Sequence, residues 1–65
     1  MSAGIKWFVE IIQERSQVSR IEPCGSLREA REIAEQTEAK VDFDPATDCI
    51  AIYQGTSWAT AKLFE

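Results

Sequence analysis

Residues 5–13 read IKWFVEIIQ, and this stretch decides the fold. It is rich in β-branched and aromatic residues and is expected to form a strand, whose alternate side chains point to opposite faces. One face is wholly apolar and consists of Ile5, Trp7, Val9 and Ile11. The other face is mixed and consists of Lys6, Phe8, Glu10 and Ile12. An apolar strand face needs a second layer of structure to cover it, and the rest of the chain is expected to supply that layer.

The residues that follow predict a turn and a second strand. Residues 14–17, ERSQ, are polar and suit a turn, after which residues 18–22, VSRIE, return as a shorter strand. Pro23 and Gly25 are expected to end this strand, because proline has no amide hydrogen to donate to a neighbouring strand.

A capping box marks the start of a helix. In this motif the Ser26 side chain accepts a hydrogen bond from the amide of Glu29, and the Glu29 side chain reaches back to the amide of Ser26. Residues 27–39, LREAREIAEQTEA, then form an amphipathic helix of about three turns. The side that faces the sheet consists of Leu27, Ala30, Ile33, Ala34 and Thr37. Its small alanine side chains permit close approach of the helix to the sheet.

Two more strands are expected after an irregular loop. The loop is residues 42–48, DFDPATD, in which a proline and turn-forming aspartates interrupt regular structure. Residues 49–54, CIAIYQ, and residues 57–64, SWATAKLF, are then predicted to be two strands of an antiparallel hairpin. Gly55 and Thr56 are expected to form its turn.

Residues 1–65 are therefore expected to form one small α+β domain of two layers, an antiparallel sheet of three to four strands with one helix on one face. A chain of this length buries only about 60% of the surface that it exposes when unfolded, so its core is thin. Such a core leaves little room for a deep pocket, which favours a binding protein over an enzyme. No apolar run approaches the ~20 residues that span a bilayer, and Lys6 and Glu10 interrupt the first one. We expect neither a membrane segment nor a signal peptide, and a cytoplasmic location.

The inventory of reactive side chains argues against catalysis and against a cofactor. The sequence contains no histidine and its glycines are scattered singly, so no nucleophilic triad, zinc site or phosphate-binding loop is recognisable. Asp42, Asp44 and Asp48 lack the spacing, the glycine and the glutamate of a calcium-binding EF-hand and suit a solvated turn. Cys24 and Cys49 are expected to be buried, reduced thiols, with a single disulfide as the alternative.

Acidic residues are concentrated in residues 29–48. This segment holds seven acidic and two basic residues, a net charge of −5, whereas the whole chain carries −4. The acidic residues are Glu29, Glu32, Glu35, Glu38, Asp42, Asp44 and Asp48. The glutamates recur at every third position, so successive carboxylates rise ~4.5 Å along the helix and form an oblique acidic ridge.

Two interpretations of this acidic ridge remain open. Charged residues can simply solvate the outer face of a helix, with Arg28 pairing with Glu32, and Arg31 with Glu35, one turn apart. Alternatively, the ridge binds a basic partner and imitates a phosphate backbone. The position of the acids favours binding, because anions near a helix C-terminus interact unfavourably with the helix dipole by about 0.3–1 kcal/mol each.

The sheet face that the helix leaves uncovered is a second candidate surface. If the strands pair as predicted, Phe8, Ile12, Tyr53 and Trp58 lie together on it. Aromatic side chains on a sheet can stack on the bases of single-stranded nucleic acid, but such proteins add a basic surface, and this chain is acidic. Direct nucleic-acid binding is therefore disfavoured, and a hydrophobic cluster or a protein contact is the better interpretation.

Three stretches together resemble a known group of proteins. They are the aromatic strand KWFVEII at residues 6–12, the segment SRIEPCGSLREAREIAEQ at residues 19–36, and the aromatic closing segment IAIYQGTSWATAKLF at residues 50–64. In length, order of elements and the helix opening SLxEAxxIA, the chain resembles small phage-encoded anti-CRISPR proteins directed at type I Cascade surveillance complexes. Within that group it is most similar to an acidic member directed at the type I-C complex.

The resemblance implies a stoichiometric, non-catalytic inhibitor that acts in the cytoplasm of a bacterial host and binds a Cascade subunit that normally grips DNA. Several such inhibitors look like DNA to their target, which agrees with the acidic ridge. A monomer is expected, because the charge of residues 29–48 repels a second copy. The alternative is a small structural or regulatory protein-interaction module, for example a homodimer, that uses the aromatic sheet face.

Overall fold

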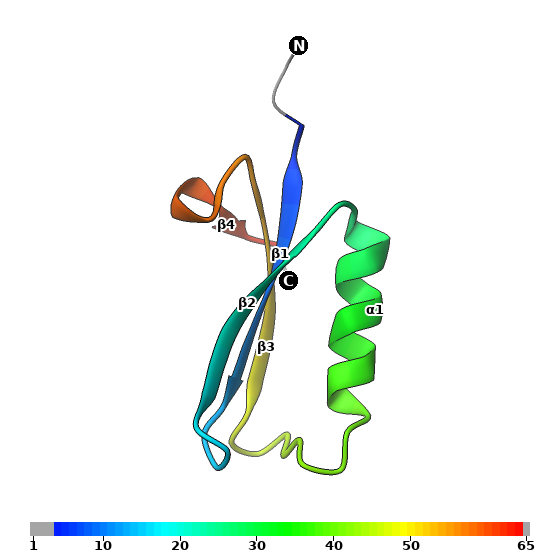
Figure 1. Cartoon of the computed structure of the whole chain (residues 1–65), viewed down its shortest axis with the longest axis vertical. Coiled ribbons are helices and arrows are strands. Elements are labelled where there is room, and N and C mark those ends of the chain that lie inside the picture. The colour runs from blue at the N-terminus through cyan, green and yellow to red at the C-terminus, as the bar shows by residue number, and fades with distance from the viewer. Residues whose placement is uncertain (1–3, 65) are drawn as a thin grey trace.

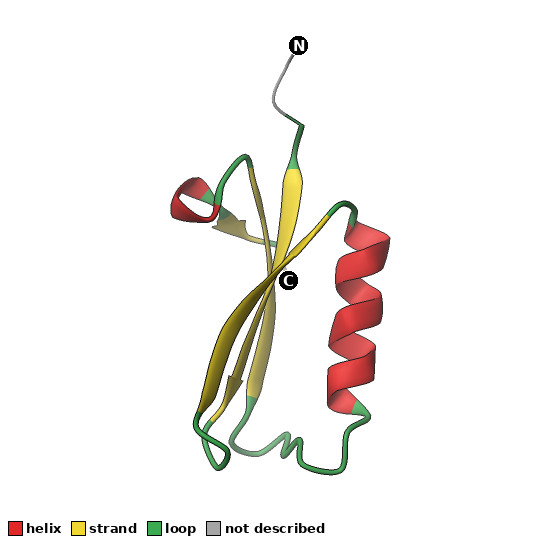
Figure 2. Cartoon of the chain, viewed as in Figure 1, coloured by secondary structure: helices red, strands yellow, loops and turns green. Residues whose placement is uncertain are grey.

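The computed structural model describes residues 4–64, which form a four-stranded antiparallel sheet and one α-helix. The elements are β1 (Lys6–Gln13), β2 (Val18–Cys24), α1 (Leu27–Glu38), β3 (Cys49–Gly55), the 3-10 helix η1 (Trp58–Thr60) and β4 (Lys62–Leu63). The strands are arranged in the order β2-β1-β3-β4, and α1 lies against one face of the sheet (Figures 1 and 2). The predicted α+β fold is thus confirmed.

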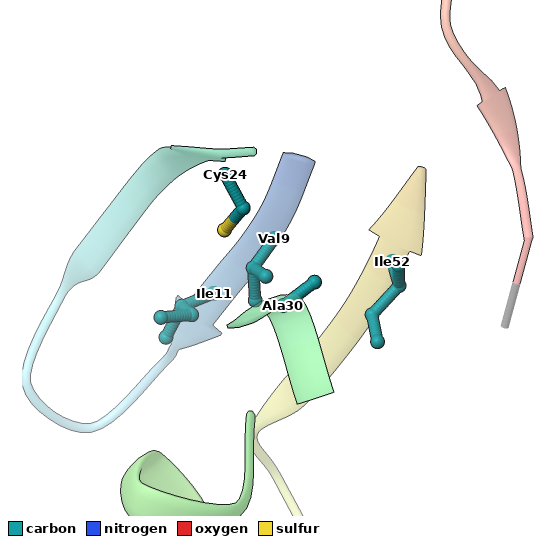
Figure 3. Close-up of a cluster of buried hydrophobic side chains, with 5 residues drawn as sticks. All are labelled: Val9, Ile11, Cys24, Ala30 and Ile52. Carbon is teal, nitrogen blue, oxygen red and sulfur yellow. The ribbon is translucent and has the colours of Figure 1, made fainter. Parts of the chain in front are cut away.

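The core lies between α1 and the apolar face of β1. β1 is a central strand, and its Val9 lies opposite Glu22 of β2 and Ile52 of β3. The buried cluster consists of Val9, Ile11, Cys24, Ala30 and Ile52 (Figure 3). Partly buried around it are Trp7, Leu27, Ile33 and Ile50. Within residues 4–64, the largest side chains that are fully enclosed are Val9 and Ile11, so the core is as thin as the chain length predicts.

The helix α1 forms where its sequence predicts and begins at a reciprocal cap. Ala30 is fully buried against the sheet, as expected for the small residues of this face. At the N-terminus, Ser26 Oγ accepts a hydrogen bond from the amide of Glu29 at 3.2 Å. Glu29 Oε2 accepts one from the amide of Gly25, also at 3.2 Å, and not from the amide of Ser26 as expected. The glutamate therefore reaches one residue further back along the chain.

The hairpin of β1 and β2 is longer than predicted. Residues 14–17 form the expected turn, but β2 continues through Pro23 to Cys24 instead of ending before the proline. β2 is an edge strand, and a proline fits there when its nitrogen faces away from the neighbouring strand. Successive backbone amides of a strand point to alternate sides, so the amides of Ser19 and Ile21 point to the same outer edge as the nitrogen of Pro23.

The predicted second strand of the C-terminal hairpin, residues 57–64, does not form as one strand. The 3-10 helix η1 interrupts it, and β4 is only two residues long. Gly55 ends β3 next to Ala61, where a Cβ atom on residue 55 would lie 2.7 Å from the Ala61 Cα. The chain therefore closes through a wider loop, and η1 brings Trp58 to the side of the sheet opposite α1.

The two cysteines are free thiols on opposite faces of the sheet. Their partners on β1 are five residues apart, or about 16 Å, so the cysteines are too far apart to form a disulfide within this fold. Cys24 is buried beneath α1, as expected, and burial is the main reason why the pKa of its thiol is raised. The prediction that Cys49 is buried is wrong, because it lies on the face that α1 does not cover.

Candidate partner-binding surfaces

The structure places the seven predicted acidic residues in three different settings. Exposed to solvent are Glu29, Glu32, Glu35, Glu38 and Asp42. Asp44 is half-buried, and its Oδ1 accepts a hydrogen bond from the amide of Ala46 at 2.9 Å within its own loop. Asp48 is buried, with 6% of its surface exposed. The acidic ridge of α1 is thus present on the surface, but its extension along the following loop is shorter than expected.

Glu29 and Glu32 take part in local contacts on α1. Glu29 caps the start of α1 through the amide of Gly25. Glu32 forms an ion pair with Arg28 one turn earlier, with 3.4 Å between Arg28 Nε and Glu32 Oε1. Both side chains of this pair are exposed, so the pair stabilises the helix by at most about 1 kcal/mol. The solvation interpretation therefore accounts for these two residues.

The remaining exposed acids form what we call the C-terminal acidic cluster, Glu35, Glu38 and Asp42, at and just beyond the last turn of α1. No basic residue lies in that last turn, and Lys40 follows it. Glu35 and Glu38 belong to that last turn, where an anion interacts unfavourably with the helix dipole by about 0.3–1 kcal/mol. The helix dipole therefore does not account for the position of these two glutamates.

Asp48 has a structural role. Its Oδ2 accepts a hydrogen bond from the amide of Asp44 at 2.9 Å. Its Oδ1 accepts bonds from the amide of Glu14 at 3.2 Å and from the hydroxyl of Thr47 at 3.1 Å. The bond from the Asp44 amide is the main reason why the pKa of Asp48 is lowered; the other two act in the same direction and burial opposes them. The carboxylate joins the loop before β3 to the turn after β1, so it is engaged within the fold.

The second candidate surface is the open sheet face, which we define as the side of the sheet opposite α1. The Trp58 ring packs on Tyr53 with centroids 4.8 Å apart and on Phe8 with centroids 5.8 Å apart. The predicted grouping of these three rings is confirmed, although Trp58 comes from η1 and not from a strand. Phe8 is 6% exposed beneath this cover, whereas Trp58 is 40% exposed and Ile12, further along β1, is 36% exposed.

Sequence reasoning did not single out Glu10, which also lies on the open sheet face. The hydroxyl of Tyr53 donates a hydrogen bond to Glu10 Oε1 at 3.2 Å. Burial is the main reason why the pKa of Tyr53 is raised, and the Glu10 carboxylate raises it further, so the hydroxyl remains a donor at neutral pH. The one signal in the sequence was a carboxylate in the middle of an otherwise apolar strand.

No pocket is found in the described part of the chain, and no group of three or more cysteine, aspartate or glutamate side chains in it is placed to hold a metal ion. Within residues 4–64, no helix has the length and apolar character that crossing a membrane requires. Comparison of the chain with protein-family models, curated proteins and solved structures finds no match.

Proposed function

We propose that the protein is a non-catalytic inhibitor that occupies the basic DNA-binding groove of a protein partner and so keeps DNA out of it. The observation that carries this proposal is the exposed C-terminal acidic cluster, at an end of α1 where anions disfavour folding. As the resemblance to anti-CRISPR proteins implies, the partner is a subunit of a type I Cascade complex, with type I-C as the first to test.

A helix suits this role because its carboxylates keep their spacing on binding. Glu35 and Glu38 are separated by ~4.5 Å along the axis of α1. Charge complementarity between two proteins chiefly speeds their encounter and selects the partner. Salt screens this attraction, because the Debye length falls from about 10 Å at 0.1 M salt to about 3 Å at 1 M. Inhibition through this surface is therefore expected to weaken as salt rises.

The test uses purified type I-C Cascade and a labelled target DNA duplex. DNA binding by Cascade is measured while the protein is added at low and at high salt, and we expect stoichiometric inhibition at low salt. The combined variant Glu35→Lys, Glu38→Lys, Asp42→Lys is expected to weaken inhibition at least tenfold, about 1.4 kcal/mol. All three positions are exposed, and lysine interacts favourably with the helix C-terminus, so circular dichroism should show an intact fold.

The matched control compares two single variants. Glu35→Lys and Glu14→Lys make the same charge change at exposed positions, one inside the C-terminal acidic cluster and one in the turn between β1 and β2. Only Glu35→Lys is expected to weaken inhibition. A folded triple-lysine variant that inhibits as well as the wild type would falsify the proposal and leave the acidic ridge as a solvated surface.

A further inference from the structure

The open sheet face carries a carboxylate among apolar side chains. Glu10 lies on β1, where its neighbours in the register are Ile21 of β2 and Ala51 of β3, and both are partly exposed. Ile12 adds further exposed apolar surface on the same face. The helix lies on the other side of the sheet, so it does not cover this patch (Figure 1). The patch is therefore apolar around one central negative charge.

The carboxylate of Glu10 has one fixed partner. Tyr53 donates to Oε1, and among the described residues no fully enclosed side-chain oxygen lacks a partner, so Oε2 keeps contact with solvent on the half-buried Glu10. The basic residue that shares this face, Lys6, is four residues away on β1, about 13 Å, with Phe8 between them. An incoming group can therefore reach Oε2.

An exposed aromatic surface lies next to this carboxylate. Tyr53 contacts Glu10 through its hydroxyl and Trp58 through its ring, so it lies between the carboxylate and the exposed indole. The Trp58 and Tyr53 rings are nearly perpendicular, at 84°, and Trp58 is 40% exposed. An anion beside exposed aromatic rings suits a planar cation, which can pair with the anion and stack on the rings.

Binding of another apolar surface to this patch is favourable. It would also remove the Glu10 carboxylate from water, and this is unfavourable unless the partner brings a positive charge. Arginine fits better than lysine, because its guanidinium is planar, presents several donors and stacks on aromatic rings. We infer that the open sheet face docks a protein partner whose apolar contact surface carries one arginine, with the guanidinium on Glu10 and against Tyr53 and Trp58. This surface is separate from the C-terminal acidic cluster, and its test does not require Cascade.

The probe is the blocked tripeptide acetyl-Ile-Arg-Ile-amide, and the matched neutral probe replaces arginine with citrulline. Binding is followed by the amide signals of the labelled protein and by the indole N–H signal of Trp58. We expect the arginine peptide to shift the signals of Glu10, Ala51 and Trp58 in a saturable way, and the citrulline peptide to bind about fivefold more weakly. Glu10→Gln should reduce binding of the arginine peptide by the same factor, about fivefold.

The control variant is Glu35→Gln, which removes an exposed carboxylate from α1 and should leave peptide binding unchanged. Glu10→Gln keeps an acceptor for the Tyr53 hydroxyl, so its fold should be retained, and the dispersion of its amide signals reports this directly. The inference would be overturned if the two peptides bound equally well, or if Glu10→Gln bound the arginine peptide as tightly as the wild type does. It would also be overturned if the shifts were confined to the C-terminal acidic cluster, or if no signal shifted at millimolar peptide. Evidence that a second copy of the chain covers the face would overturn it as well.

Discussion

Asp48 shows how a single side chain can hold two distant parts of a small chain together. The amide of Glu14, which it binds, is 34 residues away in the sequence. Its other partners, the amide of Asp44 and the hydroxyl of Thr47, belong to its own loop. All of these bonds go to the ionised carboxylate, so protonation weakens all of them together. The end of the sheet near the β1–β2 turn is therefore sensitive to acid.

We expect the stability of the wild type to fall more steeply in acid than that of Asp48→Asn. Because the pKa of Asp48 is lowered in the folded state, its contribution is fully present above the usual aspartate pKa of about 3.9. The contribution is lost as the pH falls below that value toward the folded-state pKa. Urea unfolding of both proteins at about pH 6, pH 4 and pH 3 measures the difference.

The control for this prediction is Asp42→Asn, which changes an exposed aspartate. It should remain close to the wild type in stability at neutral pH and in its response to acid. Asp48→Asn should be the less stable of the two variants at neutral pH. Parallel pH profiles for the wild type and Asp48→Asn would show that the hydrogen bonds of Asp48 do not contribute to stability.

Individual side chains were the part of this molecule that sequence reasoning placed least well. Asp48 looks like the other acids of its segment, and only the folded loop brings the Glu14 amide to it. Cys24 ends β2 and Cys49 begins β3, yet one is buried under α1 and the other is exposed. The face on which a residue lies depends on strand register and on the side that the helix covers, and neither is local information.

At the scale of elements, local patterns were sufficient for β1, α1 and β3. The alternation of side chains with a period of two predicted β1. The Ser26 cap and the apolar side of the helix predicted α1, and the predicted C-terminal end differs from the observed end by one residue. The predictions were wrong where contacts between distant parts of the chain decide the local structure. Pro23 is accepted within β2 because that strand lies at the sheet edge, and η1 replaces a strand because Trp58 packs over Phe8.

We expect Ser26→Ala to lower the free energy of unfolding by about 1 kcal/mol, because it removes the acceptor for the amide of Glu29 at the start of α1. In a domain with a thin core this is a large share of the total stability. Ser16→Ala, an exposed change in the β1–β2 turn away from the helix ends, is the control and should have little effect. Urea unfolding of the two variants compares them, and equal losses would contradict a capping role.

The whole molecule is less compact than its length suggests. Its radius of gyration is 12.3 Å, compared with about 11 Å for an average domain of 65 residues, and its shortest dimension is 15 Å. One sheet and one helix make two layers, and η1 covers only the part of the open sheet face around Phe8. The open sheet face follows from this shape, since the helix shields one side of the sheet only.

We expect the protein to be a monomer at micromolar concentration. A net charge of −4, concentrated in residues 29–48, opposes self-association, although Trp58 and Ile12 are exposed on the other side. Sedimentation equilibrium at low and moderate salt measures the mass directly. A stable dimer that Trp58→Ala dissociates would contradict this prediction and assign the open sheet face to contact between copies of the chain.

The proline in β2 has a consequence for how the protein behaves when crowded with copies of itself. Exposed sheet edges are templates on which chains add strand by strand into fibrils. Along the outer edge of β2, Ser19 and Ile21 offer their amides, but Pro23 has none, so an added strand would lose a hydrogen bond there. At the opposite edge, the two residues of β4 pair only with Tyr53 and Gln54 of β3, so the first part of β3 has no neighbouring strand on that side. Growth of a fibril by strand addition is thus disfavoured along β2, and the edge left open to it is the first part of β3.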